Sequence, residues 1–191
     1  MSAVATPLMT AEEFFDFCHR PENRDKRLEL ERGRVVEMSL PEERHGVVCA
    51  NASGMLWLFA RQRKRGHVCT NDTGMVVERD PDTVRGADVT FYDEVRRFDE
   101  LNVKYSDHAP KLLVEVLSPN DKPGKVIRRI YRFLAMGVAL VWVVDPEDRT
   151  LTVIRSGKEP VEFKAEQEVT GDDVLADLRM KVADLFAMPG D

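Results

Sequence analysis

Residues 111–117, Lys-Leu-Leu-Val-Glu-Val-Leu, decide the fold of this chain. Apolar side chains lie on both faces of this strand pattern, which is typical of a central strand covered on both sides. A helix pattern follows at residues 122–135 and ends at Gly137, and residues 139–144, Ala-Leu-Val-Trp-Val-Val, form a second buried strand. The three elements predict a strand–helix–strand crossover with parallel strands and a right-handed connection.

The remaining expected elements surround this unit. Thr10 and Glu13 form a capping box at the start of a short helix over residues 11–19. Two apolar stretches flank Gly33, which predicts a hairpin with a positive φ angle at Gly33. The other expected elements are a long helix at 42–65 that ends at Gly66, strands at 67–70, 74–78 and 87–92, an edge hairpin at 150–155 and 160–164, and a helical turn at 182–186. This order predicts a fold of the α/β or α+β class, in which helices flank a central mixed β-sheet.

Length and composition favour a globular protein with one domain. The chain has 191 residues, of which 43% are hydrophobic and 32% charged, and its formal net charge is −6. We therefore expect a single domain over residues 1–191. The three cysteines form no CxxC pair, and no apolar run approaches the roughly 20 residues of a membrane span. These features argue against a disulfide scaffold and predict a cytoplasmic protein with no membrane segment or secretion signal.

Glu115 is the residue that points most directly to chemistry. It is a single acid in an apolar strand, where an unpaired carboxylate needs a cation or strong donors nearby. A structural salt bridge to an arginine of a neighbouring helix is one interpretation. A metal site is the other, because Asp88 lies inside the strand pattern at 87–92, and two acids on neighbouring strands form an oxygen cage for Mg²⁺ or Mn²⁺. Alternatively, Asp88 caps its strand after the preceding turn.

The helix pattern after Glu115 supplies positive charge. Its cations recur at steps of three or four residues and line one face: Lys122, Lys125, Arg128, Arg129 and Arg132. No acid interrupts this segment. A basic face beside paired carboxylates suits an anionic, phosphate-bearing substrate, and the alternative is an ordinary solvated helix face.

Two further residues are candidates for the same site. Glu29 is a third acid, placed between two leucines in the first hairpin strand. His45, near the start of the long helix, could orient a water molecule or contact a phosphate. A single histidine is, however, more often a cap or a surface residue.

Several segments of the chain together resemble a known family. They are ELERGRVVEMS at 29–39, RHG at 44–46, RGADV at 85–89, LVEVLSP at 113–119 and VWVVDP at 141–146. In this order and spacing they are similar to the Uma-two family, within the PD-(D/E)XK nuclease superfamily, over residues 9–186. No single motif is specific, and the order and spacing carry the resemblance.

The resemblance implies a restriction-endonuclease-like core at about residues 9–187. It also implies a Mg²⁺ or Mn²⁺ site built from Asp88 and Glu115, to which Glu29 contributes. In the superfamily a lysine two places after the glutamate completes the site, and this chain has Leu117 there. In the Uma-two pattern that lysine lies on the following helix, where this chain has Arg129.

The arginine is the departure that bears on activity. Arginine does not act as a general base at ordinary pH, although it can stabilise the charge of a phosphate. Lys125 lies one helical turn earlier and is the other candidate for the lysine's role.

The family resemblance therefore implies a metal-dependent endonuclease that hydrolyses phosphodiester bonds of DNA. The expected catalytic residues are Asp88, Glu115, Arg129, Glu29 and Lys125, and the expected substrate-binding residues are His45, Lys122 and Arg132. The alternative is a catalytically inactive module of the nuclease fold that binds nucleic acid or a protein partner. A homodimer is expected, because a duplex offers two strands.

Overall fold

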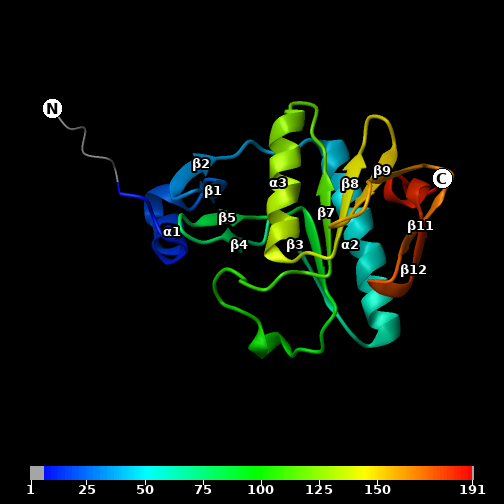
Figure 1. Cartoon of the computed structure of the whole chain (residues 1–191), viewed down its shortest axis with the longest axis horizontal. Coiled ribbons are helices and arrows are strands. Elements are labelled where there is room, and N and C mark those ends of the chain that lie inside the picture. Colours follow the sequence, from blue (N-terminus) through cyan, green and yellow to red (C-terminus); the bar gives the residue numbers. More distant parts are fainter. Residues whose placement is uncertain (1–6, 191) are drawn as a thin grey trace.

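A six-stranded mixed sheet forms the centre of the structure (Figure 1). The computed structural model describes residues 7–190. In spatial order the strands are β10 (Val161–Lys164), β9 (Thr150–Ile154), β8 (Leu140–Asp145), β7 (Leu112–Val116), β6 (Val89–Tyr92) and β3 (His67–Thr70). β7 and β8 are parallel, whereas the other neighbours are antiparallel. The predicted mixed sheet is confirmed, and so is its parallel pair, β7 and β8, which are connected along the chain by a helix.

Two long helices cover the two faces of this sheet. Val114 of β7 lies in the core cluster formed with α2 (Glu43–Arg63), and Leu113 lies in the cluster formed with α3 (Pro123–Met136). Successive side chains of a strand point to opposite faces. Glu115 therefore lies on the face that α3 covers.

The ends of the helices are set by local backbone geometry. α3 ends at Gly137, which has a φ angle of 110°, as predicted. α2 ends earlier than expected, because Lys64 rather than Gly66 is its cap in the left-handed conformation, with φ at 51°. α1 (Ala11–Cys18) begins with the predicted capping box, in which Thr10 accepts from the N–H of Glu13.

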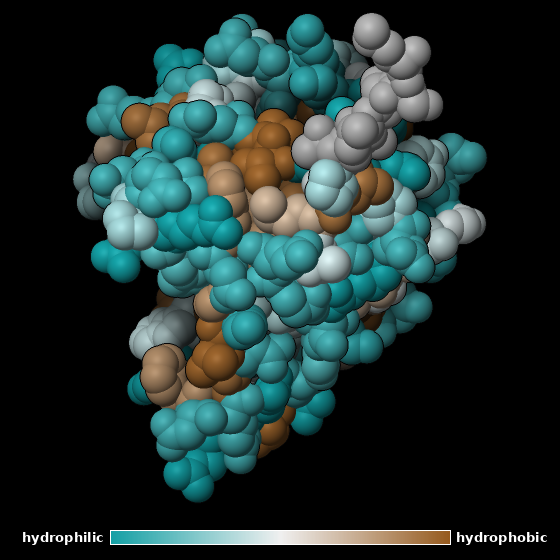
Figure 2. Space-filling model, turned by 90° about the vertical axis from the view of Figure 1, so that its left-hand side faces the viewer, coloured by the Kyte–Doolittle hydropathy of each residue, from teal (hydrophilic) through white to brown (hydrophobic). Residues whose placement is uncertain are grey.

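A second, four-stranded sheet lies beside the first, in the order β2 (Arg34–Glu37), β1 (Leu28–Glu31), β5 (Thr83–Arg85) and β4 (Met75–Glu78). The predicted hairpin around Gly33 forms its edge. β5 was not expected, since residues 79–86 have the character of a loop, and it pairs with β1 through a single residue pair, Leu30 and Val84. Figure 2 views the molecule from this side and shows hydrophobic patches set among hydrophilic residues.

The C-terminal region contains a hairpin that the sequence pattern does not reveal. β11 (Glu168–Gly171) pairs with β12 (Leu175–Lys181) and is followed by the 3₁₀ turn η3 (Val182–Leu185), which matches the expected helical turn. The buried residues of β12 are Leu175, Leu178 and Met180. Their spacing departs from strict alternation because Asp177 has a positive φ angle of 72°.

The remaining short elements are the 3₁₀ turns η1 (Pro21–Asn23) and η2 (Phe98–Glu100). Within residues 7–190, none of the helices has both the length and the apolar character needed to span a bilayer.

We predict that Gly33→Ala destabilises the fold and that Gly54→Ala does not. At Gly33 the φ angle is +73° and a Cβ atom would lie 2.6 Å from Cβ of Leu8, so the substitution should reduce the free energy of unfolding by about 1–3 kcal/mol. Gly54 lies inside α2, and a Cβ atom there meets nothing within 4 Å. Alanine should stabilise that helix by up to about 1 kcal/mol. Urea unfolding of both variants measures this, and equal effects would contradict the assigned backbone geometry.

Candidate active site

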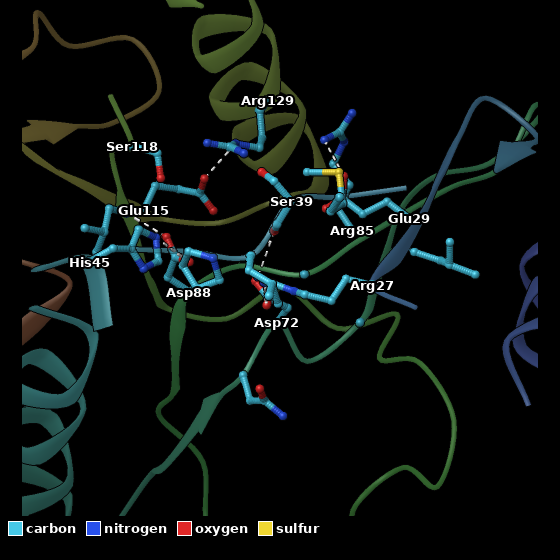
Figure 3. Close-up of a pocket in the computed structure, with 18 of the residues that line it drawn as sticks. Arg27, Glu29, Ser39, His45, Asp72, Arg85, Asp88, Glu115, Ser118 and Arg129 are labelled. Atoms are coloured by element: carbon cyan, nitrogen blue, oxygen red, sulfur yellow. Dashed lines mark hydrogen bonds and ion pairs between the residues drawn. The ribbon is translucent and has the colours of Figure 1, made fainter. Parts of the chain in front are cut away.

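A polar pocket of about 430 Å³ lies where β6, β7, α3 and the hairpin β1–β2 approach one another (Figure 3). Its charged lining residues are Arg27, Glu29, Glu42, His45, Asp72, Arg85, Asp88, Glu115, Asp121 and Arg129. The pocket thus collects the three acids singled out by the sequence, together with His45 and Arg129.

Asp88 and Glu115 enter this pocket from neighbouring strands. Val89 pairs with Val114 in antiparallel register, so continuing the register by one residue puts Asp88 opposite Glu115. Directly opposed residues of such a pair have Cβ atoms about 5 Å apart. The expectation that Asp88 lies inside its strand is wrong by one position, since β6 begins at Val89. Asp88 instead caps the sheet, because its Oδ2 accepts a hydrogen bond of 2.7 Å from the N–H of Val116.

Glu115 forms a buried ion pair with the helix above it. Its residue exposure is 2%, and its Oε2 lies 2.6 Å from Nε of Arg129. The salt-bridge interpretation of Glu115 is therefore realised in this structure. Burial raises the pKa of Glu115 to about 8, although the positive charge of Arg129 opposes this shift. The nearby negative charges of Asp88 and Glu29 raise the pKa further.

Glu29 lies in the same pocket but is bound to another arginine. Its Oε2 accepts a hydrogen bond of 2.8 Å from Nη1 of Arg85, as Figure 3 shows. Burial is the main cause that raises the pKa of Glu29. Within residues 7–190, Glu29, Asp88 and Glu115 do not form a set whose ligand atoms all lie within 4.8 Å of one another. The expectation that Glu29 approaches the same point as the other two acids is therefore not met in this conformation.

His45 projects from the first turn of α2 onto Asp88. Its Nε2 lies 3.2 Å from Oδ1 of Asp88, and the hydrogen bond to this carboxylate raises the pKa of the imidazole. Its Nδ1 lies 3.4 Å from Sγ of Cys49. Cys49 was not among the expected site residues. The signal that would have found it is the spacing of four residues from His45, which places both side chains on one helix face.

The basic face of α3 divides into separate roles. Arg129 points into the pocket, as expected. Arg132, expected to bind substrate, is instead occupied by two acids of the protein, because it lies 2.6 Å from Oε1 of Glu31 and 3.2 Å from Oε2 of Glu78. Lys122 and Lys125 are exposed at the start of α3, and neither is among the residues that line the pocket.

A mixed sheet that brings two acids of adjacent strands and a helix-borne arginine into one pocket defines an α/β protein with a carboxylate-lined candidate active site. The Uma2 family, described as "Putative restriction endonuclease", matches residues 11–183, and the chain belongs to this family.

A solved structure agrees with the fold. The crystal structure of "a putative nuclease belonging to DUF820" from Anabaena variabilis has a TM-score of 0.76 with this chain at 20% sequence identity, and the match covers 93% of this chain and 97% of that one. At this identity the likeness supports the fold alone. A comparison with curated proteins gave no match.

We predict that Glu115 makes the metal-free protein less stable as pH rises. The pKa of this carboxyl is 4.5 ordinarily and about 8 in the folded chain, so between these values the folded state holds a proton that the unfolded state releases. The unfolding free energy should therefore decline from about pH 5 to about pH 8, by at most about 1.4 kcal/mol per pH unit. Urea unfolding across this range should show a shallower decline for Glu115→Gln than for the wild type.

The comparison between variants isolates Glu115 from other titrating groups. His45 also has a raised pKa, and its contribution declines with rising pH in the same direction. Glu22→Gln, at an exposed position, is the matched control and should keep the wild-type slope. Identical slopes for the wild type and Glu115→Gln would show that Glu115 is ionised throughout.

Proposed function

We propose that the chain is a metal-dependent endonuclease that hydrolyses phosphodiester bonds of DNA, with Asp88 and Glu115 as the ligands of Mg²⁺ or Mn²⁺. The observation that carries this proposal is the position of the two acids, which line one polar pocket and lie opposite each other when the register of β6 and β7 is continued by one residue. Membership of the Uma2 family supports a nuclease activity.

The residues of the pocket fit a hard divalent cation. Carboxylate oxygens are the ligands that Mg²⁺ and Mn²⁺ prefer. Burial, and secondarily the negative charges of Asp88 and Glu29, keep the pKa of Glu115 raised although Arg129 lies 2.6 Å away. A cation bound beside Glu115 would favour its ionised form. A bound cation would supply Lewis-acid polarisation of the phosphate and a water molecule of lowered pKa.

The chain's own residues would position the ligands and the substrate. The N–H of Val116 and the imidazole of His45 hold the two oxygens of Asp88, so the orientation of this carboxylate is fixed before any ion binds. Glu29 lies across the pocket and adds negative charge, while Arg85 holds its carboxylate in place. We assign His45 the role of positioning Asp88.

The arginines of the pocket offer donors to a phosphate. The Nε atom of Arg85 is buried and has no hydrogen-bond partner within residues 7–190. Nε of Arg129, in contrast, lies 2.6 Å from Oε2 of Glu115. A buried donor without a partner is costly, and an anionic oxygen is the acceptor that relieves this cost most strongly. Arg129 would stabilise the negative charge that develops on the phosphate in the transition state. Lys125 is a weaker candidate for this role because its side chain is exposed outside the pocket.

We further propose that the substrate is DNA and that residues 1–191 form one domain. We also propose that the protein assembles as a homodimer. A duplex has two strands, and two copies of the pocket would permit both to be cut.

A second candidate function is a nuclease-fold module that binds nucleic acid or a protein without cutting. One observation favours it: protein groups already bind both carboxylates, through His45 and Val116 at Asp88 and through Arg129 at Glu115. Metal binding alone does not distinguish the two candidates, whereas cleavage does.

We predict that the chain nicks supercoiled plasmid DNA with Mg²⁺ or Mn²⁺ and that Asp88→Asn and Glu115→Gln abolish the activity. Each substitution removes an anionic ligand while keeping the side-chain size, so metal affinity should fall with little change in packing. Conversion of supercoiled to open-circular plasmid measures the rate, with Ca²⁺ as a non-activating comparison.

Asp99→Asn is the matched control, because Asp99 is exposed in η2 and does not line the pocket. It should keep the wild-type nicking rate. A wild type that raises its melting temperature with millimolar Mg²⁺ but nicks no DNA would support the inactive binding module instead.

We predict that Arg129→Ala lowers kcat on the order of 100-fold and that Arg129→Lys is intermediate. The guanidinium of Arg129 lies 2.6 Å from Glu115 and 4.0 Å from Asp121, an arrangement that one ammonium group does not reproduce. Arg128→Ala is the control, since Arg128 is exposed on the same helix, and its kcat should match the wild type. A gain of activity in Arg129→Lys would show instead that arginine impairs the site.

A further inference from the structure

His45, Cys49 and Asp88 form a compact set of potential metal ligands. One ligand atom from each residue lies within 4.8 Å of those of the other two. The imidazole stands between the other groups, with Nδ1 3.4 Å from Sγ of Cys49 and Nε2 3.2 Å from Oδ1 of Asp88. In tetrahedral zinc sites two ligand atoms are separated by about 3.6 Å, and a histidine binds the ion through one nitrogen. Because different nitrogens face Cys49 and Asp88, the imidazole or the thiol must rotate so that one nitrogen, the sulfur and a carboxylate oxygen converge on the ion.

The positions of the three residues are supported by the surrounding structure. His45 and Cys49 are four residues apart on α2 and therefore share one helix face. Asp88 is oriented by the N–H of Val116, which binds its Oδ2 and leaves Oδ1 directed at the imidazole. A ligand carboxylate held by an outer hydrogen bond is a recurring feature of metal sites.

The set lies beside two pockets: His45 and Asp88 line both, whereas Cys49 lines one of them. All three residues are partly buried, and they line a second pocket of about 500 Å³ that borders the first. Asp72 also lines this second pocket, and its negative charge acts on His45 and Cys49. Burial, together with the charges of Asp88 and Asp72, raises the pKa of Cys49 to about 12, so the thiol keeps its proton until an ion displaces it. An ion therefore has an entry path and an electrostatically favourable surrounding.

We propose that His45, Cys49 and Asp88 bind a borderline-soft divalent transition metal, with Zn²⁺ as the preferred physiological ion and water as the fourth ligand. A thiolate and an imidazole select zinc over Mg²⁺, which prefers oxygen ligands alone. Three protein ligands and one open position are the arrangement of catalytic zinc sites, whereas structural sites are closed by four protein ligands. On binding, the thiol proton of Cys49 passes to solvent and the ion replaces one of the two contacts of the imidazole.

This site shares Asp88 with the proposed nuclease centre. Zn²⁺ bound through Cys49 would engage the carboxylate that Mg²⁺ needs, so zinc would inhibit cleavage. The inhibition rests on the proposed function, whereas the binding itself does not.

Cobalt is the probe that reports the sulfur ligand directly. Titration of the chelator-treated full chain with Co²⁺ should produce the near-ultraviolet thiolate-to-cobalt charge-transfer band, and Zn²⁺ should abolish the band by displacement. In Cys49→Ser the band should be lost, and the affinity for Zn²⁺ measured by calorimetry should fall by at least about 100-fold. His45→Asn should weaken the binding as well.

Cys69→Ser is the matched control. Cys69 is also a free, half-buried thiol, but it lies on β3 outside the ligand set. This variant should keep the band and the affinity of the wild type. A wild type without a thiolate band, or a band that disappears in Cys69→Ser and persists in Cys49→Ser, would overturn the proposal. Melting temperatures in chelator verify that each variant is folded.

The nuclease assay separates this proposal from the proposed function. If the chain cuts DNA, micromolar Zn²⁺ should reduce the Mg²⁺-dependent rate in the wild type and in Cys69→Ser. In Cys49→Ser the reduction should be weaker by at least about tenfold in zinc concentration, relative to that variant's own rate without zinc. If the chain does not cut DNA but shows the cobalt band, the zinc site stands and the nuclease proposal fails. If it cuts DNA and shows no cobalt band, the nuclease proposal stands and the zinc site fails.

Discussion

The burial of the Glu115 carboxylate is the constraint on which the rest of the site depends. The residue is 2% exposed in the middle of a six-stranded sheet, so water does not solvate it and compensation must come from the element that covers its face. That element is α3, which supplies Arg129 at 2.6 Å. Removing Glu115 would leave Arg129 as a buried charge without its nearest partner, which is more destabilising than the intact pair is stabilising. The strand–helix–strand unit therefore contains both Glu115, on β7, and its positively charged partner Arg129, on α3.

A second set of ion pairs begins at Glu29 and Arg85, which line the pocket, and extends away from it. Arg85 on β5 binds both Glu29 and Glu31 of β1, and Arg132 of α3 binds Glu31 and Glu78. These contacts join the four-stranded sheet to α3 and so to the main sheet. The hairpin is thereby held against the pocket by charge as well as by the apolar cluster that Leu30 forms with α1. The sequence pattern places Arg132 on a basic, substrate-binding helix face. In the structure its ion pairs connect α3 to the four-stranded sheet.

Periodicity in the sequence was sufficient for the elements that bury an apolar face, including β7, α3, β8 and the long helix α2. It also identified Glu115, because a lone acid in such a strand is conspicuous. It did not separate Arg129 from Arg132, since both lie on one helix face and their acidic partners are remote in the chain. It missed β12, where a positive φ angle at Asp177 interrupts the alternation. It also missed Cys49, because the spacing from His45 indicates a shared helix face but not that Asp88 approaches this face.

Asp88 links the two strands of the site to α2, because it lies next to Val116, His45 and Glu115. Val116 binds one of its oxygens and thereby caps the pairing of β6 with β7, while His45 binds the other and ties the same point to α2. On its other side Asp88 faces Glu115 across the strands. A hard cation between the two acids and a softer ion between Asp88 and Cys49 would both need this carboxylate, and one carboxylate does not serve both geometries at full strength. The ion bound by Asp88 would therefore decide whether both carboxylates are available to a hard cation or whether Asp88 is occupied by the ion at Cys49.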